Sequence, residues 1–365
     1  MSVNIEKINI SKFSRPFIIA EMSGNHNQSL DRALKIVDAA AKVGAHALKL
    51  QTYTADTITL NVKDGEFFIN DKENLWKGQS LYKLYEKAYT PWEWHETIIK
   101  RANELDLICF STPFDDTAVD FLEDLDVPAY KIASAEIIHL PLLKKVAATG
   151  KPMIISTGMA SITEIDEAVR TIRKANCEQI VLLKCTSTYP ATPEDSNVLT
   201  IPRMRELFGC EVGLSDHTMG VGAAVAAVAH GATVIEKHFT LRRADGGVDS
   251  AFSMEPEEMK QLVVETERAW QSLGKVNYGP TESEKGSVKF RRSLYIAEDM
   301  RKGDVLTEKN LRIVRPGLGL PPKYYARGQP ILVNGEDIIL DKQLILELLG
   351  TLEETAKRVE RLFIR

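Results

Sequence analysis

Eight short apolar runs, separated by longer segments of helical period, constrain the fold of this chain more than any other feature. They lie at residues 16–21, 45–51, 107–112, 129–134, 152–157, 179–187, 210–216 and 233–239. Strands buried on both faces of a parallel sheet read as continuous apolar runs, and these do. Eight strand and helix units over roughly 270 residues match a (β/α)8 TIM barrel in number and length. We therefore predict an α/β fold whose main domain is such a barrel.

Apolar residues at helical spacing predict helices between the runs, among them 30–44, 118–125, 140–150 and 162–175, and a further helix after the last run, at 255–274. The Ala-rich segment 221–234 has the length and composition of one buried helix. The second run is followed by a long excursion, residues 53–91, whose length is typical of a functional lid or a binding loop. The alternative is a packing insert that caps the barrel mouth.

The pattern changes after the last predicted barrel helix. Residues 275–292 are polar and contain Gly, as a linker would, and short strands and turns follow them. We place a domain boundary near Gly286, which gives a barrel over 1–285 and a small domain over 286–365. The final segment, 341–365, has the spacing and mixed charge of an amphipathic helix.

The charge and composition of the chain argue against some classes of partner and function. The 365-residue chain is 44% hydrophobic and 27% charged, with a net charge of −5, so it has no overall attraction for nucleic acid or anionic membranes. Its N-terminus lacks the apolar core of a signal peptide, and no run of about 18 apolar residues occurs. The four cysteines include no close pair, which argues against a disulfide framework. These observations predict a cytoplasmic protein with neither nucleic-acid nor membrane partners.

Every apolar run ends in residues too polar for a barrel interior. They are Glu21; Lys49 and Gln51; Ser111 and Thr112; Lys131 and Ser134; Ser156 and Thr157; Thr186 and Ser187; 215–217; and 236–238. Catalytic groups of such barrels come from the carboxyl ends of several strands, so these residues predict a polar ring around one site. Lysines at positions 49, 131 and 237, with the hydroxyls of the ring, would bind a phosphate or carboxylate.

Two histidines, His217 in GLSDHT and His238 in EKHFT, end the last two runs. Neighbouring parallel strands lie about 4.8 Å apart, so both imidazoles can face one small site as metal ligands. Each follows a carboxylate within two residues, Asp216 or Glu236. The alternative is that each histidine is a hydrogen-bonded structural residue.

An anion site beside a metal indicates carbon–carbon bond formation between a phosphorylated acid and a carbonyl, with the metal as Lewis acid. Glu21 and Asp249 would serve nearby as ligands through water or as acid and base groups. A Schiff-base aldolase that uses Lys131 or Lys237 is the rival enzyme class. A non-catalytic sugar-binding scaffold is a third reading, since a fold does not fix a function.

Eight motifs, in chain order, carry a family resemblance. They are IAEMSGNHNQSLDRA, KLQTYTADTITL, STPFD, YKIAS, STGM, KCTSTYPA, GLSDHT and EKHFT. Together they resemble the sialic acid synthase family, which condenses phosphoenolpyruvate with an N-acetylated sugar. Residues 51–60, 75–95 and 185–191 are most similar to pseudaminic acid synthases, whose acceptor is 2,4-diacetamido-2,4,6-trideoxy-altrose. Neuraminate and legionaminate synthases, the alternatives, typically carry Asn where this chain has Ser187.

The resemblance implies a role for each matching residue. His217 and His238 would bind Mn²⁺ or Mg²⁺, Glu21 and Asp249 would act near the reacting carbons, and Tyr189 with the excursion would meet the sugar. The residues expected around phosphoenolpyruvate or elsewhere in the substrate site are Lys49, Gln51, Thr112, Lys131, Ser134, Ser156, Ser187 and Ser215.

The segment after Arg292 resembles the antifreeze-like (SAF) domain that follows the barrel in this family. In a domain-swapped homodimer, Arg315 of one chain would reach the sugar site of the other. The chain departs from the family pattern over 326–350 and then adds its helical tail.

Overall fold

The structure is a computed structural model that describes residues 2–71, 74–299, 301, 307–323, 332–334 and 337–339. The chain forms two compact units, Met1–Gly274 and Lys275–Arg365. The division falls at the start of the predicted linker rather than near Gly286. In the described part of the chain, no helix combines the length and apolar character needed to cross a membrane.

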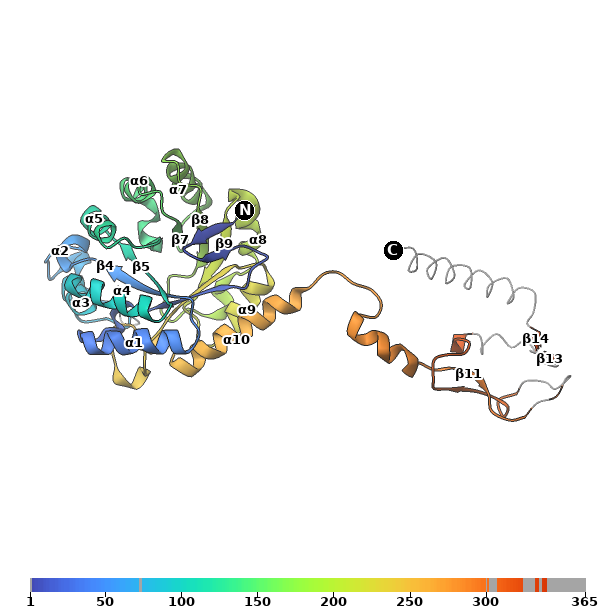
Figure 1. The fold of residues 1–365 in the computed structure, drawn as a ribbon. Helices are drawn as coiled ribbons and strands as arrows, with labels where there is room; N and C mark the ends of the chain where they lie inside the picture. The colour runs from blue at the N-terminus through green and yellow to red at the C-terminus, as the bar shows by residue number, and fades with distance from the viewer. Residues whose placement is uncertain are drawn as a thin grey trace. The chain divides into compact units, whose positions relative to one another are not determined.

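Eight parallel strands form a closed barrel in the first unit (Figure 1), and each of the eight predicted runs overlaps one of them. They are β3 (Phe17–Glu21), β4 (Ala47–Thr52), β5 (Ile108–Pro113), β6 (Tyr130–Ile132), β7 (Met153–Ser156), β8 (Ile180–Cys185), β9 (Glu211–Ser215) and β10 (Val234–His238). Consecutive strands are neighbours, and β10 pairs with β3 to close the ring. The predicted TIM barrel is confirmed.

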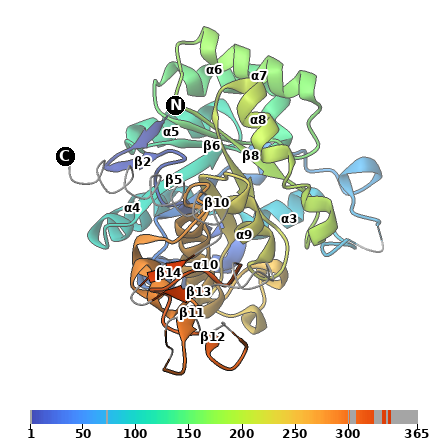
Figure 2. The same cartoon turned by 90° about the vertical axis from the view of Figure 1, so that its right-hand side faces the viewer.

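Helices surround the barrel on its outside (Figure 2). They are α1 (Leu30–Lys42), α4 (His95–Glu104), α5 (Asp116–Asp124), α6 (Leu140–Ala148), α7 (Ile162–Lys174), α8 (Thr200–Phe208), α9 (Gly222–Ala229) and α10 (Pro256–Leu273). Capping residues mark the N-termini of several of these helices. At α7, for example, Ser161 and Glu164 form a capping box. The predicted buried helix over 221–234 ends earlier, at Ala229, and a turn through Gly231 (φ +92°) leads into β10.

An N-terminal hairpin, which the sequence did not lead us to expect, packs against the start of the barrel strands. Its strands are β1 (Val3–Ile5) and β2 (Ile8–Ile10). The hairpin shares one apolar cluster with inward-facing strand residues: Val3, Ile5, Ile10, Phe17, Ile19, Ala47, Ile108, Phe110, Ala129, Ile154, Val181, Leu183 and Val234. The amino-terminal end of the barrel is therefore filled by apolar side chains.

The excursion after β4 contains α2 (Ala55–Ile58), a 3-10 turn at Gly65–Phe67 and α3 (Leu81–Ala88). In the second unit, the 3-10 helix η8 (Glu282–Phe290) occupies the segment predicted as linker. β11 (Ser293–Ile296) pairs with β12 (Leu311–Val314), and β13 (Leu332–Asn334) pairs with β14 (Asp337–Ile339). The predicted C-terminal helix over 341–365 lies outside the described residues.

Candidate active site

On the barrel strands, an inward-facing apolar side chain is followed, two residues later, by an inward-facing side chain that can take part in chemistry. Side chains two residues apart on a strand point to the same side. The pairs are Ile19 with Glu21, Ala47 with Lys49, Ala129 with Lys131, Ile154 with Ser156, Leu183 with Cys185 and Val234 with Glu236. A layer of chemistry-bearing groups therefore lies directly above the apolar cluster, at the carboxyl ends of the strands.

A cavity of about 470 Å³ opens at this polar layer. It is lined by most of the predicted site residues: Lys49, Gln51, Lys131, Ser134, Ser156, Ser187, Tyr189, Ser215, His217, His238 and Asp249. Glu21 lies behind the lining and forms an ion pair with Lys49, 2.6 Å from Nζ to Oε2. Thr112 is buried, and its hydroxyl has no hydrogen-bond partner in the part of the chain that the structure describes. Arg315 follows β12 in the second unit.

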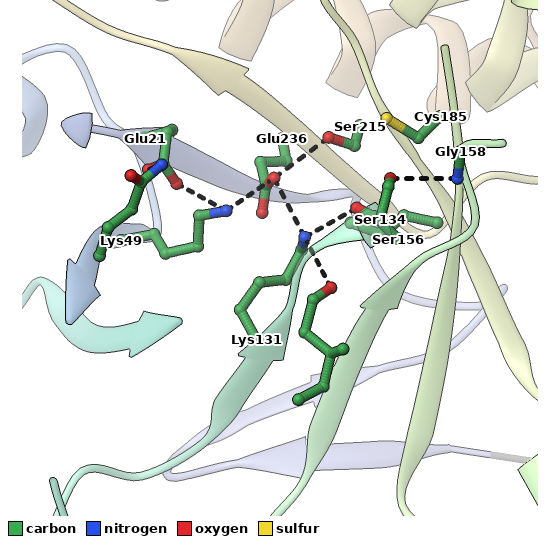
Figure 3. Close-up of polar contacts among 12 residues, drawn as sticks. Glu21, Lys49, Lys131, Ser134, Ser156, Gly158, Cys185, Ser215 and Glu236 are labelled. Atoms are coloured by element: carbon green, nitrogen blue, oxygen red, sulfur yellow. Dashed lines mark hydrogen bonds and ion pairs between the residues drawn. The ribbon is translucent and has the colours of Figure 1, made fainter. Parts of the chain in front are cut away.

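Glu236 is the centre of a buried charge network, and Figure 3 shows both lysines directed toward it. Its Oε1 lies 2.9 Å from Lys49 Nζ and 3.5 Å from Lys131 Nζ, and it accepts a hydrogen bond from Ser215. Burial raises the pKa of Glu236, but Lys131 and Lys49 outweigh burial and lower this pKa to about 2. Burial lowers the pKa of Lys49 to about 7. The carboxylate therefore stays charged and holds the Nζ atoms of Lys49 and Lys131 in place.

We expected Glu236 only as a member of the polar ring and assigned it no role in the site, although the sequence contained a stronger signal. It lies two positions before His238 on one strand, so both side chains share the inward face.

The expectation that Lys237 serves the site is wrong. Lys237 lies between Glu236 and His238 on the same strand, so it faces the other side of the sheet. Its side chain points to the opposite face, where Nζ donates to Asp216 Oδ2 at 2.8 Å and to the carbonyls of Thr218 and Gly220. Lys237 does not line the cavity. It is a structural residue, and neither the anion site nor a Schiff base can use it in this position.

Two further serines approach each other across Gly158. Ser134 Oγ accepts a hydrogen bond from the Gly158 amide at 3.1 Å. A Cβ at position 158 would collide with Ser187 Oγ and lie 2.7 Å from Ser134 Oγ. The glycine therefore lets both hydroxyls converge on one side of the cavity, and Figure 3 shows the contact of its amide with Ser134.

The histidine pair has the donor chemistry of a metal site. The ring centroids of His217 and His238 are 5.4 Å apart. The carbonyl of Thr186 can only accept, so His217 Nδ1, 2.9 Å away, carries the proton and leaves Nε2 with a free lone pair. His238 Nδ1 is buried without a hydrogen-bond partner in the described structure. Burial lowers the pKa of His217 to about 4 and that of His238 well below its usual value. Both rings are neutral at pH 7, as metal binding requires.

Among the described residues, no group of three His, Cys, Asp or Glu side chains is arranged to hold a metal. Two neutral imidazoles with open lone pairs still fit a divalent ion whose other positions are filled by substrate or water.

Aromatic side chains form the outer part of the cavity wall. Tyr189 lies against His217, with ring centroids 4.4 Å apart, and its ring is 5.8 Å from that of Trp76 in the excursion. The Trp76 indole N–H donates to the carbonyl of Val248 at 2.8 Å. Excursion residues Tyr53, Ile58, Trp76, Leu84 and Tyr85 all line the cavity. The excursion is therefore part of the site and not only a packing insert.

Glu136 and Ser23 also line the cavity, and we predicted neither. Burial raises the pKa of the Glu136 carboxyl, and its Oε2 has no hydrogen-bond partner within the described residues. Ser23 donates to Asp249 Oδ2. Glu136 lies in a 3-10 turn, η4 (Ser134–Ile138), just beyond β6, so its position could have been suspected from the polar ring.

Comparison with known proteins agrees with this geometry. The model of the NeuB family matches residues 36–278, and that of the SAF domain matches residues 291–332. The chain is 44% identical over 312 residues to a pseudaminic acid synthase of Helicobacter pylori, covering 85% of this chain and 91% of that protein. It is also 44% identical over 317 residues to a pseudaminic acid synthase of Campylobacter jejuni, covering 87% and 92%.

A solved structure gives the same result for the fold. The crystal structure of an N-acetylneuraminic acid synthetase from Leptospira borgpetersenii, in complex with citrate, matches with a TM-score of 0.70 at 32% identity. The match covers 80% of this chain and 96% of that one. The predicted order of a barrel followed by a small antifreeze-like domain is confirmed.

Proposed function

Since this chain belongs to the NeuB family, we propose that it is a pseudaminic acid synthase, which condenses phosphoenolpyruvate with 2,4-diacetamido-2,4,6-trideoxy-altrose. Identity of 44% to two pseudaminic acid synthases, against 32% to a neuraminic acid synthetase, favours this acceptor. One observation carries the proposal: the two buried lysines and the two neutral histidines line the same cavity.

The anionic substrate fits the inner part of this cavity. Lys131 and the protonated form of Lys49 supply positive charge, and Glu236 already fixes the Nζ atoms of both. Ser134, Ser156 and Ser187 line the same region and offer hydroxyl donors to phosphate or carboxylate oxygens. Phosphoenolpyruvate would therefore bind against β6, β7 and β8.

His217 and His238 would hold a divalent metal, Mn²⁺ or Mg²⁺, which when bound supplies Lewis-acid polarisation of the acceptor aldehyde. The aromatic wall of Tyr189 and Trp76 would orient the sugar above this point.

In the reaction, carbon 3 of phosphoenolpyruvate attacks the aldehyde carbon, water adds to carbon 2, and phosphate leaves with cleavage of the carbon–oxygen bond. Asp249 lines the cavity and Glu21 lies behind the lining against Lys49, and we assign to these two carboxyl groups the proton exchange with the attacking water and the new hydroxyl group.

An acceptor panel tests the function. With phosphoenolpyruvate and Mn²⁺, phosphate release should have its highest kcat/KM with the altrose derivative, compared with N-acetylmannosamine and the diacetamido mannose derivative. A preference for N-acetylmannosamine would make the chain a neuraminate synthase, and a preference for the mannose derivative a legionaminate synthase. Release with none of the three would support the sugar-binding scaffold.

The small domain would act in trans, in a domain-swapped homodimer in which Arg315 reaches the partner's barrel. The planar guanidinium of an arginine can hold a sugar amide or an acidic group in a fixed orientation. Arg315 lies in a Gly- and Pro-rich turn directly after β12.

Mixed dimers test this arrangement. Arg315→Ala and Lys131→Ala chains, each nearly inactive alone, should regain about a quarter of the wild-type turnover after random re-pairing. Half of the dimers are then hybrids, and each hybrid has one intact site of two. If mixing restores nothing, Arg315 serves its own barrel or takes no part in turnover.

A further inference from the structure

Ser23 occupies an unusual backbone conformation beside the cavity. It starts the 3-10 turn η1 (Ser23–His26), two residues after Glu21, with φ +47°. Residues other than Gly rarely adopt this left-handed region, because their Cβ then approaches the carbonyl oxygen. The residue is only 4% exposed and lines the cavity. Gly would adopt this φ without steric cost, so the conformation alone does not explain a serine here.

The hydroxyl group that Gly would lack binds Asp249. Ser23 Oγ donates to Asp249 Oδ2, although the two residues are 226 positions apart in the chain. The Gly24 amide also donates to this carboxylate. Asp249 lies in the loop between β10 and α10, so two segments from opposite ends of the barrel sequence meet at this carboxylate.

The main chain of Asp249 is held by the same turn. Asn25 Nδ2 donates to Ser253 Oγ at 2.8 Å, and Ser253 Oγ donates to the Asp249 carbonyl at 2.7 Å. Asn25 Nδ2 also donates to the carbonyl of Phe239 at 3.0 Å. The backbone around Asp249 therefore stays in place through Asn25, and Ser23 acts on the carboxylate alone.

We propose that Ser23 is a positioning residue, which fixes the Asp249 carboxylate in the orientation that the condensation needs. This inference rests on the proposed function. Burial raises the pKa of Asp249, and the Ser23 and Gly24 donors oppose this rise, so they favour the charged form as well as one orientation.

Two substitutions separate positioning from a structural role. Ser23→Gly removes the hydroxyl group and also the steric cost of the positive φ, whereas Ser23→Ala removes only the hydroxyl group. We expect kcat to fall about tenfold or more in both, since a hydrogen bond to a charged group is lost. KM for each substrate should stay within about twofold. The melting temperature of Ser23→Gly should equal or exceed that of Ser23→Ala, because Gly relieves the backbone.

Ser250→Ala is the matched control. It removes a buried hydroxyl from the Asp249 loop, where Ser250 Oγ donates to the Gly247 carbonyl and not to the carboxylate. We expect wild-type kcat from this variant. Near-normal kcat in folded Ser23→Gly, or an equal loss in Ser250→Ala, would overturn the proposal.

A crystal structure of Ser23→Gly gives a readout that does not depend on turnover. The Asp249 carboxylate should leave its wild-type orientation or lose order, while the backbone held by Asn25 stays in place. An ordered carboxylate in the wild-type orientation would refute the positioning role whatever acceptor the enzyme uses. Failure of the proposed function would instead be seen in the wild-type enzyme, as an absence of phosphate release across the acceptor panel.

Discussion

His238→Ala should abolish turnover while the thermal unfolding of the barrel stays within a few degrees of wild type. The ring lies above the apolar cluster, and its Nδ1 has no hydrogen-bond partner in the described structure. Removing it therefore leaves no polar group newly unpaired in the core. Loss of a metal ligand should remove the Lewis acid, which is worth several kcal/mol of transition-state stabilisation. Phosphate release at saturating Mn²⁺, together with calorimetric titration of Mn²⁺, measures both effects.

His46→Ala is the control, for which we expect a loss of stability without a loss of turnover. His46 Nδ1 accepts a hydrogen bond from the Ile18 amide at 2.9 Å, far from the cavity lining. Its loss leaves a backbone donor unpaired, which costs about 1–3 kcal/mol of stability, but turnover by the folded enzyme should persist. Near-normal turnover in His238→Ala would contradict the metal-ligand assignment.

Lys237→Ala should lower the free energy of unfolding by about 3–5 kcal/mol, the usual result of removing one partner of a buried ion pair. Lys237 and Asp216 are each only 1% exposed at the side chain, so the substitution leaves a carboxylate buried without its counter-ion. Urea unfolding followed by circular dichroism measures the change.

The double variant Asp216→Asn with Lys237→Met should recover much of that loss, because no uncompensated charge remains. Lys35→Ala provides the surface comparison, since Lys35 and its partner Asp31 are 62% and 78% exposed. That change should leave the free energy of unfolding almost unaltered. Stability unchanged in Lys237→Ala would mean that Asp216 finds another partner or becomes protonated at little cost.

The barrel was predictable because its signal is local and repeated. Each strand is a continuous apolar run, and each run ends in residues that cannot stay inside an apolar core. Lys49 and Lys131 were assigned correctly to the cavity for this reason. The hairpin β1–β2 was not predicted, because its three-residue strands, with a polar residue at the centre of each, resemble ordinary loop sequence.

The face of a strand to which a side chain points was harder to predict than the end of the barrel at which the residue lies. A shift of one residue along a strand moves a side chain to the other face of the sheet, and this separates Lys237 from Glu236 and His238. Applying that alternation to the motif EKH would have identified Glu236 and excluded Lys237.

The contact of Ser23 with Asp249 had no local signal at all. It joins loops that are brought together only when β10 pairs with β3 and closes the barrel. The roles of the individual site residues, including Arg315, stay predictions that the experiments above address.

The apolar cluster sealed by the N-terminal hairpin has a consequence for how such an enzyme can evolve. Because the hairpin and the inward-facing apolar residues fill one end of the barrel, they supply folding stability without touching the cavity. Substitutions in the polar layer and the excursion can therefore alter the accepted sugar while the lower layer keeps the chain folded. Each new acceptor can then be tested by mutation without a simultaneous loss of the scaffold.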